Sequence, residues 1–305
     1  TEIYTLSLHD ALPISKINMT GKLRYISMMA LLILLSFCSS ELSNTWPQKP
    51  SGADTNETAG SNHKTENHGI PAGLVCLKKA YPDFIDSVSS NYAYLTDGTK
   101  MVWDDGIIKS DFDSLLDYAS LKDMMSQCYK AGRNFKIPID ENYDPGRIRH
   151  EPIFYKMYGK SKGEVLKNLV AIDWFGRKLK VSKINGADKK LDSVKKELSK
   201  LPLEFHKYFV KTAGSFNFRK IAGTSRISAH SFGIAIDLNT EYSHYWRWQK
   251  PGSNGKYKYI NKMPPEIVEI FEKYGFIWGG KWYHFDTMHF EYRPELLMDG
   301  CRCSD

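Results

Sequence analysis

The chain has 305 residues, of which 42% are hydrophobic and 25% are charged, and its formal net charge is +7. A chain of this length can bury the core of one catalytic domain with appendages, and nothing in the composition suggests a second large domain. The positive charge suits an anionic polymer as partner, but charge alone does not distinguish nucleic acid from cell wall.

The N-terminal region is not expected to belong to the folded domain. Residues 1–14, TEIYTLSLHDALPI, resemble the conceptual translation of a sequencing adapter, and we exclude them from fold reasoning. The natural start is then expected at Met19, followed by two basic residues and an apolar run over 28–37. This run is shorter than the roughly 20 apolar residues of a membrane span, which favours a signal peptide over 19–38.

The predicted signal peptide ends at Cys38, which is followed by two serines, as is typical of a lipoprotein cleavage site. Phe37 departs from this pattern, because such sites usually carry a small residue there. Lipidation of Cys38 and ordinary cleavage nearby both remain open, and an uncleaved anchor is a third alternative. In each case we expect an exported protein, periplasmic or held at the membrane only through this signal or a lipid anchor.

The next two segments differ sharply in composition. Residues 39–73 are polar and almost free of aliphatic side chains, which predicts a disordered linker. Residues 74–143 are predicted to be an N-terminal helical part of unknown role. Within it, Ser110 and Asp113 resemble a capping box, and apolar residues at helical spacing behind them predict a helix over 111–130.

The five cysteines do not form a zinc-finger spacing. In an exported protein, Cys301 and Cys303 could form bridges with Cys76 or Cys128. The sequence does not give the pairing, and reduced cysteines are the alternative.

Residues 168–175 and 178–182 are predicted to be two strands joined by a tight turn at Gly176. The lysines in and after the second strand could face a polyanion, although such a run is usually a solvated face. They are Lys178, Lys180, Lys183, Lys189, Lys190, Lys195, Lys196 and Lys200.

Further helices are expected in the C-terminal half. One begins at Asp188, is interrupted by Pro202 and resumes until Gly214. Another opens at Pro264-Pro265 and closes at Gly275. Because helices precede and separate short strands, the sequence predicts an α+β domain.

The segment S-A-H-S-F-G-I-A-I-D, residues 228–237, carries the first chemical motif. Ile234 and Ile236 alternate with smaller or polar residues, which predicts a strand that ends at Asp237 with its carboxylate on the polar face. His230 precedes this strand. An imidazole and a carboxylate in this arrangement can reach one cation.

The segment W-Y-H-F-D-T-M-H-F-E, residues 282–291, carries the second motif. Met288 and Phe290 alternate with His289 and Glu291, which predicts another strand with one polar face. His289 would supply a third ligand. Three ligands drawn from His and Asp, with a fourth position left open, are typical of a catalytic zinc site.

Hydrolysis also needs a base for the attacking water, and Asp286 is the candidate. Strand parity would place Asp286 and His289 on opposite faces, so the chain must bend near Thr287 for both to reach the metal. His284 and Glu291 are rivals for this role, or they could hold a ligand ring in place.

As a set, these residues resemble the zinc D-Ala-D-Ala carboxypeptidases and L-alanyl-D-glutamate endopeptidases, which share a fold with lysostaphin-type enzymes and the hedgehog signalling domain. The family pattern is S-x-H-x-x-G-x-A-x-D followed by acid-x-x-H, and the chain has every fixed position. The resemblance runs from about Asp144 to Leu296 and is strongest over 214–292. It implies a zinc peptidase domain over 144–305, with a small antiparallel sheet that carries the zinc site between helices.

Carried over position by position, the resemblance implies that His230, Asp237 and His289 bind zinc. It makes Asp286 the catalytic acid/base. It also places an arginine upstream of the first motif, where it stabilises the developing oxyanion or holds a substrate carboxylate. Arg219 stands at that position, and the alternative is Arg226.

Substrate contacts are expected from Ser228 and Arg226 and from an aromatic cluster after Asp237. Tyr245 and Trp246 of this cluster could line a groove for stem peptide or glycan. They could equally pack over the site.

Three functions follow from the sequence. The first is a zinc peptidase of the peptidoglycan stem peptide, either a D-alanyl-D-alanine carboxypeptidase, which we favour, or an L-alanyl-D-glutamate endopeptidase. The second is a zinc-containing cell-wall-binding module without catalysis, which retention of Asp286 and Arg219 argues against. The third, a nucleic-acid-binding protein, is disfavoured by the export signal and by the absence of a nucleic-acid motif. We expect a monomer.

Overall fold

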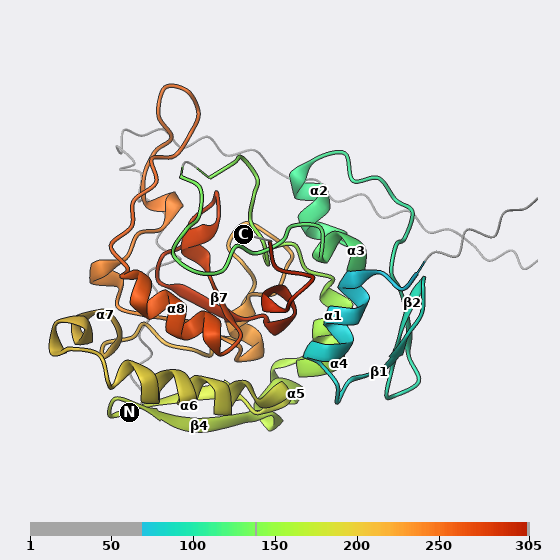
Figure 1. Cartoon of the computed structure of the whole chain (residues 1–305), viewed down its shortest axis with the longest axis horizontal. Helices are drawn as coiled ribbons and strands as arrows, with labels where there is room; N and C mark the ends of the chain where they lie inside the picture. The colour runs from blue at the N-terminus through green and yellow to red at the C-terminus, as the bar shows by residue number, and fades with distance from the viewer. Residues whose placement is uncertain (1–68, 138, 304–305) are drawn as a thin grey trace, which may run out of the picture. The chain divides into compact units, whose positions relative to one another are not determined.

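The computed structural model describes residues 69–137 and 139–303, all of which belong to one unit. Helices alternate with three small antiparallel sheets (Figure 1), which confirms the predicted α+β class. The segment 1–14, the expected signal peptide, Cys38 and most of the expected linker lie outside the described residues. Within the described residues, the helices are all too short or too polar to cross a membrane.

The longest regular element among the described residues is a helix of 12 residues. The helices are α1 (Ala72–Ala80), α2 (Phe112–Asp117), α3 (Leu121–Met124), α4 (Glu151–Tyr158), α5 (Lys162–Lys167), α6 (Ala187–Leu198), α7 (His206–Phe209) and α8 (Pro265–Lys273). The strands are β1 (Ile85–Val88), β2 (Tyr92–Leu95), β3 (Lys100–Val102), β4 (Leu169–Trp174), β5 (Arg177–Ser182), β6 (Ala235–Asp237), β7 (Phe276–Trp278) and β8 (His289–Tyr292).

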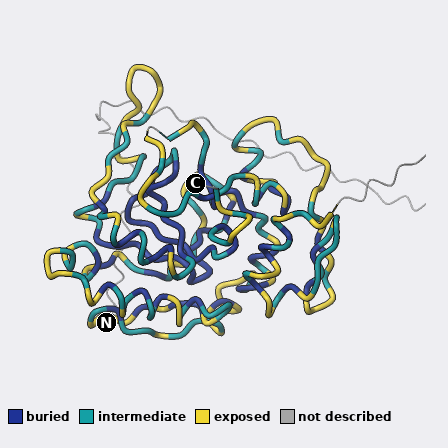
Figure 2. Tube along the Cα trace, in the orientation of Figure 1, coloured by how far each residue is buried: buried dark blue, intermediate teal, exposed yellow. Residues whose placement is uncertain are grey.

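The sheet β6-β8-β7 lies at the centre of the core, and every residue of its three strands is buried (Figure 2). Both pairings are antiparallel, and Asp237 lies opposite His289. Phe290, on the other face of β8, stacks on Phe271 of α8 with ring centroids 3.9 Å apart. The apolar face of the sheet is thereby covered by a helix, and the polar face carries the two predicted motifs.

The N-terminal part packs into the same core. Residues 74–143 contain the expected helices but also the sheet β1-β2-β3, which the sequence analysis did not predict. One apolar cluster contains Leu77 and Tyr81 together with Ile153 and Phe154. The expected boundary at 143/144 therefore lies within a continuous core. Helix α1 begins at Ala72, inside the range 39–73 that was expected to be a linker.

The single helix predicted over 111–130 is instead two short helices, α2 and α3. Asp111, rather than Ser110, caps α2 by accepting a hydrogen bond from the backbone N–H of Ser114. Ser120 then forms a capping box with Asp123 and starts α3. Apolar spacing alone did not reveal this break. The break is set by a polar residue, Ser120, whose hydrogen bonds start a new helix.

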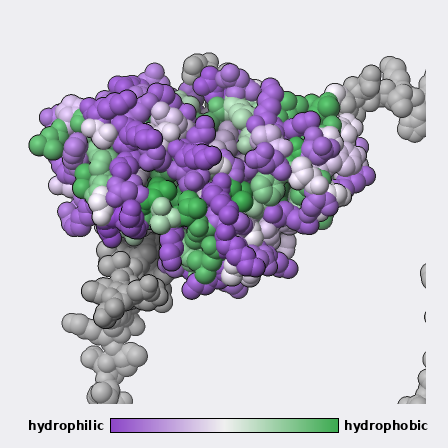
Figure 3. Space-filling view, turned by 90° about the horizontal axis from the view of Figure 1, so that it is seen from below, coloured by the Kyte–Doolittle hydropathy of each residue, from purple (hydrophilic) through white to green (hydrophobic). Residues whose placement is uncertain are grey.

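The predicted hairpin is confirmed as β4 and β5, and α6 packs against both strands. Lys178 and Lys180 of β5 are exposed, and Lys195 and Lys196 of α6 form ion pairs with nearby aspartates. Figure 3 views the molecule from the side on which α6 and β4 lie in Figure 1, and most of that face is hydrophilic. The lysine run is thus a solvated face.

Two disulfide bonds tie the C-terminal end to the N-terminal part. Cys76 of α1 is bonded to Cys301, and Cys128 is bonded to Cys303. The expectation that Cys301 and Cys303 pair with these two cysteines is confirmed, and the structure supplies the order that the sequence left open.

A buried ion pair within the C-terminal part also contacts the N-terminal part. Nζ of Lys281 lies 2.5 Å from a carboxylate oxygen of Glu272, and both side chains are less than a tenth exposed. The same carboxylate accepts a hydrogen bond from the hydroxyl of Tyr129 at 2.7 Å. Lys281 also donates to the carbonyl oxygens of Lys130 and Gly132. Burial lowers the pKa of Lys281, and Glu272 opposes this shift.

Glu272→Gln is expected to lower the free energy of unfolding by about 3 kcal/mol, because it leaves the Lys281 ammonium buried without its counter-charge. Urea denaturation followed by circular dichroism measures the change. Lys273→Gln, which breaks the exposed pair with Glu197, is the matched control and should cost much less. Equal losses in the two variants would contradict a special contribution of the buried pair to stability.

Candidate metal centre and adjoining pocket

Three side-chain atoms from the two motifs converge in the structure. Nε2 of His230 lies 3.2 Å from Nδ1 of His289 and 3.2 Å from Oδ1 of Asp237. Oδ1 of Asp237 lies 3.0 Å from Nδ1 of His289. All three residues are buried, and together they form a group able to hold a metal ion.

The remaining ring nitrogens show where the protons lie. Nδ1 of His230 is 2.7 Å from the carbonyl oxygen of Ser215, which can only accept, so this nitrogen carries the hydrogen. Nε2 of His289 faces a carboxylate oxygen of Glu291 at 3.4 Å. In neutral rings, the two nitrogens that face each other therefore both present lone pairs, as does Asp237. In that state three acceptors face one another without a donor, and a positive charge between them, from a metal ion or from a proton on His289, satisfies them.

The spacing of these acceptors fits zinc. Tetrahedral bonds of about 2.0–2.1 Å place neighbouring ligands about 3.3 Å apart, close to the separations seen between these atoms. The local charges also favour a cation. Burial opposes ionisation of Asp237, but His230 and His289 hold its pKa well below the ordinary value. Burial likewise lowers the pKa of His289, but hydrogen bonds to Asp237 and Glu291 outweigh it and raise the pKa to about 10.

The local sequence explains how His230 reaches this position. It lies in the 3-10 helix Ala229–Phe232, which ends at Gly233 in the left-handed conformation with φ of 69°. A Cβ at Gly233 would lie 2.5 Å from Cδ2 of Leu169, so both the conformation and the space require glycine. The turn then leads directly into β6, whose last residue is Asp237.

The bend demanded near Thr287 is present. The backbone N–H of His289 donates to the carbonyl oxygen of Asp286 at 3.2 Å, and Thr287 is fully buried between them in a turn. The N–H of Asp286 donates to the carbonyl oxygen of Gly279 at 2.9 Å. A Cβ at Gly279 would lie 2.6 Å from the carbonyl oxygen of Asp286, so only glycine allows this approach.

A pocket adjoins the three converging side chains, and most of the residues predicted for the site line it. They are Arg219, Arg226, Ser228, His230, Tyr245, His284, Asp286, His289 and Glu291. Sequence reasoning missed Arg147, Arg149 and Trp282, which line the same pocket. Both arginines belong to the segment D-P-G-R-I-R, residues 144–149, where the resemblance begins. Two arginines so close together were the feature of the sequence that could have indicated this side of the pocket.

The two candidate arginines are held differently. The backbone of Arg219 is bound to Ser231 and accepts a hydrogen bond from the N–H of Ser228, and its side chain is partly exposed. Arg226 is 8% exposed, and its Nε lies 3.1 Å from Oδ1 of Asp117 in α2. Burial and the neighbouring cation Arg147 lower the pKa of Arg226. This end of the pocket therefore has a concentration of positive charge.

His284 and the aromatic residues take distinct places. Tyr245 lines the pocket, and burial together with the carboxylate of Asp286 raises its pKa. Trp246 is not among the pocket-lining residues and instead packs edge-on against the ring of His284, with centroids 4.6 Å apart. Nδ1 of His284 lies 2.5 Å from Oδ2 of Asp144. His284 is thus directed by a carboxylate and does not join the metal group.

Glu291 is the partner of His289 rather than a member of the converging group. Its other carboxylate oxygen lies 3.4 Å from Arg293 and 3.9 Å from Arg149. Burial raises the pKa of Glu291, but His289 and the two arginines outweigh it and lower the pKa to about 2. An ionised Glu291 can hold the His289 ring with its Nδ1 toward Asp237.

Residues 222–292 match a family model described as D-alanyl-D-alanine carboxypeptidase. Over this segment the chain is similar to this peptidase family. The matched segment contains His230, Asp237, Asp286 and His289. It begins after Arg219, which it does not include. Comparison with curated proteins and with solved structures found no match.

The match to the D-alanyl-D-alanine carboxypeptidase model gives the converging group a chemical context, because all three of its residues fall within the matched segment. The arginine-rich side of the pocket is contributed largely from outside it, by Arg147, Arg149 and Arg219. The match therefore covers the metal group and only part of the pocket.

His230→Ala is expected to lose bound metal, because it removes one of three converging ligands. Zinc content after dialysis, measured by atomic emission, reports the loss. His284→Ala is the control, since this histidine borders the same pocket but is bound to Asp144, and it should retain the wild-type zinc content. Unchanged zinc in the His230 variant would remove that residue from the ligand set.

Proposed function

We propose that the chain is a zinc metallopeptidase that acts on the stem peptide of peptidoglycan as a D-alanyl-D-alanine carboxypeptidase. The observation that carries this proposal is the convergence of His230, Asp237 and His289 beside a cationic pocket, inside the segment that matches the family. The same resemblance supports a hedgehog-like fold for the small sheet that carries the three residues.

The roles proposed for the side chains follow from their places around the pocket. When bound, zinc would polarise the scissile carbonyl group and lower the pKa of water. The carboxylate of Asp286 takes the proton of the attacking water and returns it to the leaving amine. Its position in the pocket wall and its electrostatic effect on His289 support this role. Arg219 stabilises the charge that develops on the carbonyl oxygen.

The arginines favour the carboxypeptidase over the endopeptidase. A carboxypeptidase must hold the terminal carboxylate of its substrate, whereas an endopeptidase needs a groove that is open on both sides of the metal. Arg226 and Arg147 provide cationic groups suited to such a carboxylate, and bidentate binding to a planar carboxylate is the preferred use of arginine. Ser228 and Tyr245 line the same pocket and are proposed to contact the substrate.

We also propose that the protein is exported and acts as a monomer in the periplasm, free or anchored through Cys38. The two disulfides support export, because such bonds persist in oxidising compartments. The family match supports peptidoglycan rather than nucleic acid as the polymer.

The first test is mass spectrometry of pentapeptide-containing wall fragments incubated with residues 69–305, with and without a chelator. Loss of only the terminal alanine, prevented by the chelator and restored by zinc, is the expected result. Cleavage within the stem would make the protein an endopeptidase. No cleavage by zinc-loaded protein would favour a binding module without catalysis.

Asp286→Asn is expected to keep zinc bound and to lower kcat by a factor of about 100 or more, since it removes the proposed base. Zinc analysis and the same peptide assay measure the two effects on one preparation. A fully active variant would reassign the base to His284 or Glu291.

A further inference from the structure

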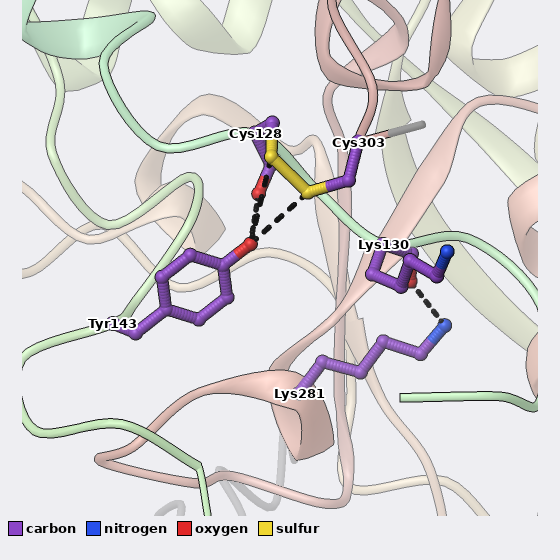
Figure 4. The surroundings of a disulfide bond; sticks show 5 residues. All are labelled: Cys128, Lys130, Tyr143, Lys281 and Cys303. Atoms are coloured by element: carbon purple, nitrogen blue, oxygen red, sulfur yellow. Dashed lines mark hydrogen bonds between the residues drawn. A yellow bond between two sulfur atoms is a disulfide. The ribbon is translucent and has the colours of Figure 1, made fainter. Parts of the chain in front are cut away.

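A series of contacts connects the Cys128–Cys303 disulfide to the pocket. Tyr143 lies beside this disulfide, with its hydroxyl donating to the carbonyl oxygen of Cys128 and lying 3.3 Å from Sγ of Cys303 (Figure 4). The segment that contains residue 143 is therefore fixed to both halves of the bridge.

Gln127, the neighbour of Cys128, holds the same segment on either side of Tyr143. Its Nε2 donates to the carbonyl oxygen of Asn142 at 2.8 Å, and its Oε1 accepts from the backbone N–H of Asp144 at 2.7 Å. Both functional groups of one amide are thus used to fix the backbone over 142–144.

Asp144 in turn forms hydrogen bonds with the segment around His284, which borders the pocket. Its side chain is fully buried, with Oδ1 accepting from the backbone N–H of His284 at 2.9 Å and Oδ2 lying 2.5 Å from Nδ1 of that ring. The carbonyl oxygen of Tyr143 accepts from the N–H of Tyr283 at 2.9 Å. Three contacts therefore fix the backbone and the ring orientation two residues before Asp286.

We propose that Asp144 is a positioning residue for His284 and for the segment that carries Asp286, and that Gln127 and the Cys128–Cys303 disulfide hold Asp144 in place. This inference rests on the proposed function for its effect on turnover. Its physical basis is that proton transfer tolerates little displacement of the groups involved. Asp144, Gln127 and Cys128 all lie outside residues 222–292, so the site is completed by a part of the chain that the family match does not include.

The kinetic test is a double-mutant cycle. Asp144→Asn keeps the volume of the side chain but leaves only one acceptor oxygen, so it cannot accept from both the backbone N–H and Nδ1–H of His284. It is expected to lower kcat by a factor of about 10 to 100 with zinc content unchanged. In a His284→Ala background only the backbone N–H of residue 284 remains as a partner, so the further loss of kcat should be clearly smaller than in the wild type. Losses that multiply independently would overturn the proposal.

The two disulfides provide a matched comparison. The double variant Cys128→Ala/Cys303→Ala should lower kcat, whereas Cys76→Ala/Cys301→Ala should change it by less than about twofold, since only the first bridge contacts Tyr143. Both are assayed well below their melting temperatures. Equal losses of kcat would reduce the bridge to a general stabiliser and overturn its proposed role.

A readout that does not depend on activity separates this inference from the proposed function. Labelling by diethyl pyrocarbonate, followed by peptide mass spectrometry, should modify His284 severalfold faster in Asp144→Asn and in Cys128→Ala/Cys303→Ala than in the wild type. His150, which contacts the carbonyl oxygen of Ala119, is the internal control. Unchanged labelling of His284 would overturn the positioning role, whereas an inactive wild type with the expected labelling would overturn only the proposed function.

Discussion

The pairing of β6 with β8 is the constraint on which the site depends. Only in this register does Asp237 lie opposite His289 with both side chains on the polar face. A slip by one residue would turn one strand's ligand toward α8 and bury it among aromatic rings. The stacking of Phe290 on Phe271 opposes such a slip, because Phe290 occupies the face of β8 toward which the ligand would have to turn. The apolar core therefore enforces the geometry of the polar face.

Buried charges of alternating sign extend from this register into the N-terminal part of the chain. His289 contacts Glu291, Glu291 lies near Arg293, and Arg293 lies 2.6 Å from Glu295. Glu295 then accepts a hydrogen bond from the hydroxyl of Tyr81 at 2.5 Å. Each buried charge has an opposite neighbour, so the cost of removing it from water is offset along the series. The ionised state of Glu291 thus depends on residues well outside the metal group.

The features that local sequence determines were predictable. The two strands that carry His289 and Asp237 were read from alternation of period two, and the bend at Thr287 followed from strand parity. The turn before β6 has a glycine at position 233, where the positive φ and the nearby Leu169 side chain require it.

The features that depend on distant pairing were not predictable. Strand β7 has no alternation of its own because it is buried on every side. Arg147 and Arg149 line the pocket, and Asp144 contacts His284 beside it, because the fold brings this segment against others more than 70 residues away, as the bond from Arg149 to Ile227 illustrates. Cysteine spacing likewise allowed either pairing, since Cys301 and Cys303 are two residues apart and only tertiary structure orders their partners.

The positions of the disulfides also govern the order in which the molecule can be completed. Both bridges use a cysteine from the last residues described, and their partners lie 225 and 175 residues earlier. Neither bridge can close until residues 301 and 303 have been synthesised, so the preceding core must first form without either covalent link.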